Sequence, residues 1–152
     1  MKKIIVTLMA ITVYGCATKP GIKMLVECKT PVSINIKGPA LVGQGYGLEM
    51  TPIPIDALQY TDGSVASSVA VQAVRATRSA TDTVQVTARV VNCTDKPISV
   101  RARSSFMDEK QIPTEPTSAW KILFLSPKAT SIYQEFSIST NVSHYLIELG
   151  KE

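Results

Sequence analysis

Few side chains in this sequence can do chemistry, and their types exclude most classes of enzyme. The chain of 152 residues contains one histidine, His144, and three cysteines, Cys16, Cys28 and Cys93. Zinc sites take three or four Cys, His or carboxylate ligands at regular spacings, and this chain has neither several histidines nor four cysteines. No Cys-x-x-Cys pair is present, and His144 is the only candidate base for a cysteine nucleophile. We therefore expect no catalytic residue, no metal site and no enzymatic activity.

Cys16 follows a segment with the features of a bacterial export signal. Two lysines precede an apolar run from Ile4 to Val13, and the small residue Gly15 comes directly before the cysteine. A transmembrane helix needs about 20 apolar residues, so this run is too short to span a bilayer. The sequence Val13-Tyr14-Gly15-Cys16 resembles the lipobox of bacterial lipoproteins, in which the cysteine thiol receives a diacylglycerol before cleavage. We predict a lipoprotein signal peptide over residues 1–15.

The lipobox resemblance implies an attachment and a location. Cys16 would carry a covalent diacylglycerol and an N-acyl chain such as palmitate, and we expect no other cofactor. Each buried methylene contributes about 0.8 kcal/mol of membrane affinity, so three acyl chains hold a protein on a membrane essentially permanently. In such lipoproteins an Asp after the lipid-bearing cysteine favours the inner membrane, and this chain has Ala17 there. We expect an outer-membrane anchor, a tether over residues 16–31 and a domain that faces the periplasm.

The two remaining cysteines, Cys28 and Cys93, are the natural partners for a disulfide. An envelope compartment is oxidising, and lipidation of Cys16 leaves only these two thiols. A bridge between them would close a loop of roughly sixty residues and, in the chain-entropy model, stabilise the fold by about 4 kcal/mol. The alternative is a pair of unpaired buried thiols.

The charge of the chain is modest and argues against nucleic acid as a partner. There are 16 Lys and Arg against 12 Asp and Glu, which gives a net charge of +4. Loss of Lys2 and Lys3 with the signal peptide would bring the mature domain close to neutrality. Electrostatic capture of nucleic acid strengthens with the number of phosphates that are neutralised, so a nearly neutral domain is poorly suited to it.

The elements that must position these residues are strands. Residues 84–90 and 98–106 alternate apolar and polar side chains with a period of two, which is typical of strands with one buried face. The turn residues 92–97 separate them, and we predict that the two strands form a hairpin. Further strand-like stretches occur at 32–36, 69–73, 120–125, 132–138 and 142–149.

The number and spacing of these stretches favour one fold class. About seven or eight short strands, with turns every 8–12 residues, are typical of an immunoglobulin-like antiparallel β-sandwich. We therefore predict a single all-β domain over residues 32–152. The alternative is an α+β architecture with one helix near residues 64–80.

Two sets of residues are candidate interaction sites. The segment from Leu48 to Tyr60 is apolar but interrupted by two prolines, which suits an edge strand or an extended segment that adds to a neighbour's sheet. Its candidate contact residues are Leu48, Met50, Ile53, Ile55 and Tyr60. The second set, Arg89, Arg101 and Arg103, would share one face of the predicted hairpin. These arginines are either a solvated face or a contact for an anionic partner, such as a peptidoglycan carboxylate or a lipid phosphate.

Three motifs occur in order in the second half of the chain. They are Asn92 followed by Pro97-Ile98 and Val100, a strand that ends in a turn at Asp108, and Pro127 with Ala129 and Tyr133. In this order and spacing they resemble the YcfL-like family of small bacterial outer-membrane lipoproteins over about residues 70–149. This chain departs from that pattern in its longer N-terminal part and in fewer aromatic residues before Asp108. The resemblance implies a periplasm-facing β-sandwich and leaves the biochemical role undefined.

These features lead to two hypotheses about function. The first is a non-enzymatic outer-membrane lipoprotein that serves as a structural or interaction subunit of a cell-envelope assembly, such as a secretion or conjugation core complex. Its partners would be other envelope proteins, in a large oligomeric complex. The alternative is a solitary periplasmic binding module for a cell-wall or small anionic ligand, which would need a concave pocket.

Overall fold

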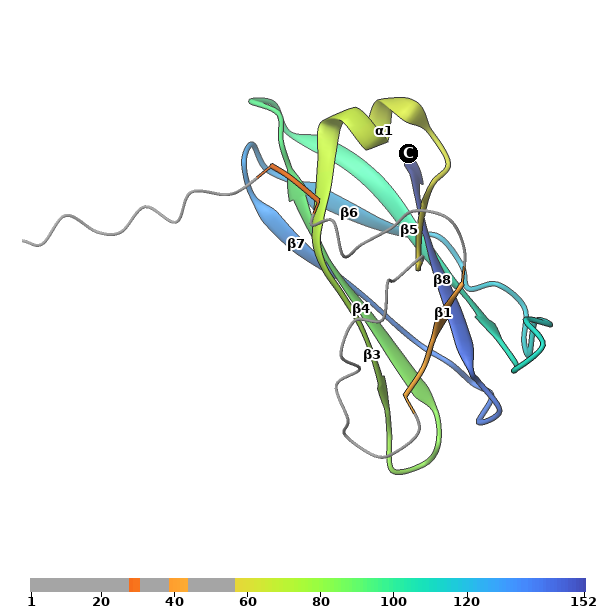
Figure 1. The fold of residues 1–152 in the computed structure, drawn as a ribbon. Coiled ribbons are helices and arrows are strands. Elements are labelled where there is room, and N and C mark those ends of the chain that lie inside the picture. Colours follow the sequence, from red (N-terminus) through yellow and green to blue (C-terminus); the bar gives the residue numbers. More distant parts are fainter. Residues whose placement is uncertain (1–27, 31–38, 44–56) are drawn as a thin grey trace, which may run out of the picture.

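Strands with one apolar face build the fold, because their alternating side chains bury every second residue. The computed structural model describes residues 28–30, 39–43 and 57–152, and its strands form two packed sheets (Figure 1). Sheet A contains β1 (Ala40–Leu41), β8 (His144–Lys151), β5 (Ile98–Met107) and β6 (Lys121–Leu125), in that order, and β2 (Leu58–Tyr60) pairs in parallel with β8. Sheet B contains β3 (Val69–Arg78), β4 (Val84–Asn92) and β7 (Thr130–Phe136). The predicted all-β sandwich is confirmed.

The core lies between the two sheets and is made of their inward-facing side chains. The largest of them are fully buried, among them Phe106, Tyr145 and Ile147 from sheet A and Tyr133 and Val86 from sheet B. Tyr133 also joins the sheets, since its hydroxyl lies 2.9 Å from the hydroxyl of Ser104 in β5. A buried phenol needs such a partner, and this bond satisfies the hydroxyl of Tyr133.

The predicted hairpin between the strands at 84–90 and 98–106 is wrong. β4 pairs with β3 and β7, whereas β5 pairs with β6 and β8, so the two strands belong to different sheets. Both strands bury one face in the same core, and alternation alone therefore cannot distinguish a hairpin from a crossing between sheets. The turn at residues 93–97 makes this crossing.

The alternative helix near residues 64–80 is present only in its first part. Helix α1 (Gly63–Ser68) is capped at its N-terminus by Asp62, whose carboxylate accepts from the backbone N–H of Ser64 at 2.7 Å. The remaining residues form β3, where a register shift between Val71 and Ala73 moves the buried positions by one residue. This irregularity interrupts the period of two, so one alternating pattern does not describe the whole of β3.

Several predicted features lie outside the described residues. They are the signal peptide at 1–15, Cys16, the strand at 32–36, and Leu48, Met50, Ile53 and Ile55. Within the part of the chain that the structure describes, no helix is long and apolar enough to cross a membrane.

Candidate interaction surface

Two turns at one end of the sandwich are held together by the buried side chain of Asn92. Its amide nitrogen donates to the backbone carbonyls of Lys96 at 2.8 Å, Leu125 at 3.1 Å and Ser126 at 3.0 Å. Its side-chain oxygen accepts from the backbone N–H and the hydroxyl of Thr94, both at 2.8 Å. The amide is fully paired, so Asn92 fixes where β5 begins and where β6 ends. This is the physical role of the asparagine that opens the first motif of the sequence.

We call residues 92–97 and 126–129 the turn platform. Lys128 links its two turns, because the ammonium group donates to the carbonyl of Cys93 at 2.7 Å and lies 3.3 Å from the carboxylate of Asp95. Figure 1 shows this end of the sandwich beside α1 and the C-terminus, with the turn between β3 and β4 at the opposite end.

A disulfide fastens the N-terminal part of the described chain to the turn platform. Cys28 and Cys93 are bonded, with Cα atoms 5.4 Å apart and 65 positions apart in the sequence. The predicted partners are therefore joined in the structure. The backbone N–H of Cys93 also donates to the carbonyl of Ser68 at 2.8 Å, which brings the end of α1 to the same place.

Beside the turn platform, the side chains of β5 and β6 alternate between the core and the outer face of sheet A. Ser99 lies opposite Phe124, and Arg101 lies opposite Ile122, on the face that points away from the core. Phe124 is 76% exposed and Ile122 is 47% exposed. We call this surface the β5–β6 face; its residues are Ser99, Arg101, Arg103, Trp120, Ile122 and Phe124. Large apolar side chains that remain exposed on a strand mark a surface available to a partner.

Two arginines of the β5–β6 face stack on the same tryptophan. The guanidinium carbons of Arg101 and Arg103 lie 4.5 Å and 4.4 Å from the centre of a Trp120 ring. Arg103 also makes a two-point ion pair with Glu148 of β8, at 2.7 Å and 3.2 Å. One carboxylate thus faces two guanidinium groups, and the face keeps a positive charge.

Gly150 of β8 provides the room for this stack. A Cβ atom at this position would lie 2.5 Å from the hydroxyl oxygen of Thr61 and 3.6 Å from the ring of Trp120. Real Cβ atoms do not approach another atom as closely as 2.5 Å, so a larger residue would displace Thr61. The lack of a side chain at Gly150 therefore lets Thr61 and Trp120 lie close to the backbone of the sheet.

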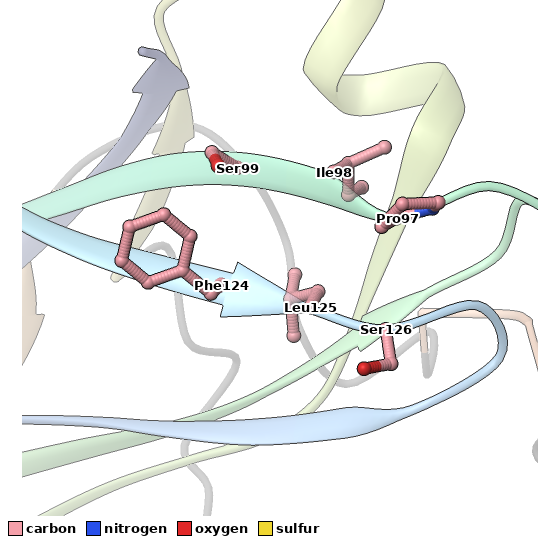
Figure 2. A pocket seen from close by; sticks show the side chains of 6 residues that line it. All are labelled: Pro97, Ile98, Ser99, Phe124, Leu125 and Ser126. Carbon is pink, nitrogen blue, oxygen red and sulfur yellow. The ribbon is translucent and has the colours of Figure 1, made fainter.

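A shallow hollow lies where the β5–β6 face meets the turn platform. Its volume is about 340 Å³, and Figure 2 shows its lining residues on the two adjacent strands. They are Pro97, Ile98, Ser99, Phe124, Leu125 and Ser126. A smaller hollow of about 120 Å³ adjoins it through Ile98 and Ser99 and reaches α1 and Lys151. Both are open, mixed apolar and hydroxyl surfaces without a cluster of ionisable groups.

The three predicted arginines do not share one face. Arg101 and Arg103 lie on the outer face of sheet A, whereas Arg89 is exposed on the outer face of sheet B, between Ala73 and Ile132 of the neighbouring strands. The expectation of a common face is wrong because β4 and β5 are in different sheets. The pair Arg101 and Arg103 remains together as an i and i+2 pair of one strand.

Of the five candidate contact residues predicted in the segment from Leu48 to Tyr60, the structure describes Tyr60. It lies in β2, opposite Leu149 of β8, and its ring packs against the core. Burial raises the pKa of the Tyr60 hydroxyl. Residues 58–60 thus add to a sheet edge of their own domain.

Sequence reasoning missed Trp120, Ile122 and Phe124 as candidate contact residues. A signal was available, because the run Lys121–Leu125 has apolar residues at both parities, whereas a strand with one solvated face alternates. Apolar residues at both parities on a strand at the sheet edge indicate a second, outer contact.

Among the described residues, no group of three or more histidine, cysteine or carboxylate side chains could hold a metal ion.

No family model and no curated protein sequence matches this chain. Two crystal structures are similar to it. A DUF1425 family member from Shewanella sp. pv-4 has a TM-score of 0.50 at 16% identity, covering 55% of this chain and 78% of that one. Campylobacter jejuni cj0090 has a TM-score of 0.49 at 9% identity, covering 63% of this chain and 98% of that one. At such an identity the likeness to the Shewanella protein concerns the fold alone.

Proposed function

We propose that this protein is a non-enzymatic outer-membrane lipoprotein that serves as an interaction subunit of a cell-envelope assembly. The anchor is supported by the signal-like N-terminus and by the lipobox resemblance at Cys16. The disulfide between Cys28 and Cys93 leaves Cys16 as the remaining cysteine, as lipidation requires. The YcfL-like resemblance supports the same location, and the β-sandwich is the fold that it implies.

One observation carries the interaction role: the exposed aromatic and aliphatic side chains of the β5–β6 face lie beside stacked arginines. Protein interfaces are enriched in aromatic residues and arginine, and a few such residues supply most of the binding energy. Phe124 and Ile122 are the apolar part of this face, and Arg101, Arg103 and Trp120 are its charged and aromatic part.

The partner should dock on the face of β6 rather than extend its sheet edge. Lys121 begins the strand, faces inward, and its ammonium group donates to the carbonyl of Gln134 and pairs with Glu135 of β7, each at 3.0 Å. An inward-pointing lysine on a short edge strand is a known protection against strand addition. Ile122 and Phe124 point outward and are accessible to a partner above the sheet.

A photo-crosslinking amino acid tests this role in the native membrane. We would place benzoylphenylalanine at Phe124, with Phe136 as the matched control, because Phe136 is a 54% exposed aromatic residue on the outer face of sheet B. The expected result is a discrete protein product from position 124 and none from position 136. Equal labelling at both positions, or no protein product at either, would argue against an interaction surface on β5 and β6.

The lipid anchor has its own test. Replacing Cys16→Ser should remove the acyl mass from the N-terminal part of the protein and deplete the protein from the outer-membrane fraction. Because cleavage follows lipidation, the uncleaved N-terminal segment should hold this variant in the inner membrane. An outer-membrane location that is unchanged in Cys16→Ser would contradict the lipoprotein assignment, and crosslinking at position 124 could still be read separately.

The hollow beside Phe124, together with the smaller one that adjoins it and reaches Lys151, supports a second candidate function, a solitary binding module for a cell-wall or small anionic ligand. That function predicts no protein product from position 124. It also predicts that a soluble muropeptide raises the unfolding temperature of the protein, because a ligand that binds only the native state stabilises it.

A further inference from the structure

We infer that the partner of the β5–β6 face is an extended protein segment that presents a carboxylate to Arg101 and a large apolar side chain to Phe124. This inference rests on the proposed function, since it names the chemistry of the partner at the same surface.

The first step concerns the charges of the two stacked arginines. Arg103 is already paired at two points by the carboxylate of Glu148. No carboxylate among the described residues pairs with Arg101, and the side chain of Arg101 is exposed. A guanidinium group forms its strongest hydrogen bonds with carboxylates, in a planar two-point geometry. Arg101 therefore supplies the charge that an acidic partner would complement.

The second step concerns the orientation of Arg101. Its guanidinium group lies 4.5 Å from the centre of a Trp120 ring, and that ring lies over the space beside Gly150. A long arginine side chain normally loses rotamer freedom when it binds a partner. Because Arg101 is already ordered against an aromatic ring, it loses less side-chain entropy on binding. Among the described residues no acceptor is hydrogen-bonded to the guanidinium group of Arg101, so its N–H donors are available to a partner while its central carbon lies over the indole.

The third step concerns the apolar neighbours. Arg101 lies opposite Ile122, and Phe124 is two residues further along the same face of β6. Residues two apart on an extended strand are separated by about 6.6–6.8 Å and point the same way. An extended partner with an acidic residue and a large apolar residue at positions i and i+2 would match Arg101 and Phe124. The hollow around Phe124 provides about 340 Å³ for the apolar side chain.

The apolar part of the surface favours a protein partner over a cell-wall carboxylate. A peptidoglycan stem peptide carries carboxylates but only small side chains, and it would leave Phe124 and Ile122 uncovered. Complementing the charge and covering both apolar residues requires a large side chain beside the carboxylate.

The test uses the full-length protein in its native membrane with benzoylphenylalanine at Phe124. We would compare the yield of crosslinked protein in the parent, in Arg101→Gln, in Arg101→Lys and in Arg89→Gln. Arg101→Gln should lower the yield about tenfold, because a hydrogen bond between charged groups is lost. Arg101→Lys should restore part of it, and Arg89→Gln, which removes an exposed arginine from the other sheet, should leave it unchanged.

Two further measurements sharpen the result. Raising the salt concentration from 0.1 to 0.5 M should reduce the yield in the parent and have little effect in Arg101→Gln, since salt screens a charge pair. Trp120 is the only tryptophan of the chain, so its emission spectrum reports whether each variant keeps the native stack. Mass spectrometry of the product should place an acidic residue two positions from the crosslinked one.

The outcomes separate this inference from the proposed function. A protein product whose yield is unaffected by Arg101→Gln and by salt would overturn the acidic partner and leave the interaction role intact. A product that contains a muropeptide, or a peptide without a nearby acidic residue, would overturn it as well. The absence of any protein product at position 124 would overturn both.

Discussion

The two ends of the sandwich are closed by different kinds of buried polar side chain. At the turn platform the neutral amide of Asn92 is the central group, and at the opposite end it is the guanidinium group of Arg78, which is 8% exposed. Arg78 donates to the carbonyls of Asp82 at 2.8 Å, Thr140 at 3.1 Å and Val142, and more weakly to that of Gly43 at 3.5 Å. All of these acceptors are backbone carbonyls.

The amide of Asn92 and the guanidinium group of Arg78 differ in the kinds of hydrogen bond that they can make. An amide has both donors and acceptors, and Asn92 uses both kinds within two turns. A guanidinium group has only donors and keeps its charge, so Arg78 depends on the dipoles of the carbonyls around it. The turn platform also carries the disulfide and adjoins the β5–β6 face. We therefore expect the turn platform to contribute more to stability and to control the interaction surface, and the Arg78 end to contribute to stability alone.

Removal of the disulfide should have the largest effect. The double change Cys28→Ser and Cys93→Ser opens a loop of 65 positions, and the chain-entropy model gives a loss of about 4 kcal/mol in the free energy of unfolding. Urea unfolding of the full-length protein in mild detergent, followed by Trp120 emission, would measure it. A decrease of less than about 1 kcal/mol in the free energy of unfolding would show that the disulfide contributes little to stability.

Asn92→Ala should lower the free energy of unfolding by about 3 kcal/mol, because it leaves the buried carbonyl of Leu125, the partly buried carbonyls of Lys96 and Ser126, and the N–H of Thr94 without this partner. We also expect a lower crosslinking yield from position 124, because the start of β5 and the end of β6 are no longer fixed. We would measure urea unfolding and the yield from position 124 in the same preparation. An unchanged yield in a destabilised protein would contradict the link between platform and face.

Arg78→Met is the matched change at the other end and should cost about 2 kcal/mol. The methionine keeps the apolar stem, and the carbonyls near the surface can bind water in place of the guanidinium group. The crosslinking yield from position 124 should be unchanged as long as the protein is folded. A larger loss than that of Asn92→Ala would reverse the proposed order of the two ends.

Alkaline pH should weaken the sandwich through its buried tyrosines. Burial raises the pKa of Tyr145, Tyr133 and Tyr60 above the ordinary value near 10. Above pH 10 the unfolded chain releases these protons while the native protein keeps them, so stability is full below pH 10 and falls by up to about 1.4 kcal/mol per pH unit for each retained proton.

Tyr145 should contribute most of this alkaline loss, because its pKa is raised furthest. Tyr145→Phe should therefore flatten the decrease of the urea midpoint between pH 10 and pH 12. If the urea midpoint of Tyr145→Phe fell as steeply with pH as that of the parent, other groups would be responsible for the alkaline loss of stability. Tyr145 lies near the start of β8, opposite Ala40 of β1, whereas Tyr60 belongs to β2 and lies opposite Leu149, near the other end of β8.

The ion pair between Arg103 and Glu148 should have the smallest effect. The side chain of Arg103 is 33% exposed, and pairs near the surface contribute about 0.5 kcal/mol or less. Glu148→Gln should change the urea midpoint only slightly, and 0.5 M salt should remove the difference. A loss above about 2 kcal/mol would mean that the β5–β6 face, like the two ends, is needed for folding.

Much of the fold could be predicted because alternation is a local property. The period of two in 84–90 and 98–106 predicted two strands with the observed buried faces, at Val86 and Val90 and at Val100 and Phe106. The pairing of Cys28 with Cys93 followed once Cys16 was assigned to the lipid. For residues 64–80 the sequence allows a helix as an alternative, because the Ser, Ala and Val residues there suit a helix as well as a strand, and the structure has a short helix followed by β3.

The candidate site could be predicted only in part. The sequence singled out Arg101 and Arg103 but grouped them with Arg89, and it missed Trp120 and Phe124 as contact residues. Whether an apolar residue of an edge strand is buried or exposed depends on what covers it, and no local pattern contains that information.

The sequence by itself determined which segments are strands and which of their faces are apolar, because both follow from side-chain order along the chain. Only the tertiary structure decided which strands share a sheet. It placed Arg101 and Arg103 on Trp120, moved Arg89 to the opposite face and gave Asn92 its partners in a turn 33 and 34 positions away. These arrangements depend on hydrogen bonds between segments distant in sequence, and such pairing is set when the sheets close around a common core.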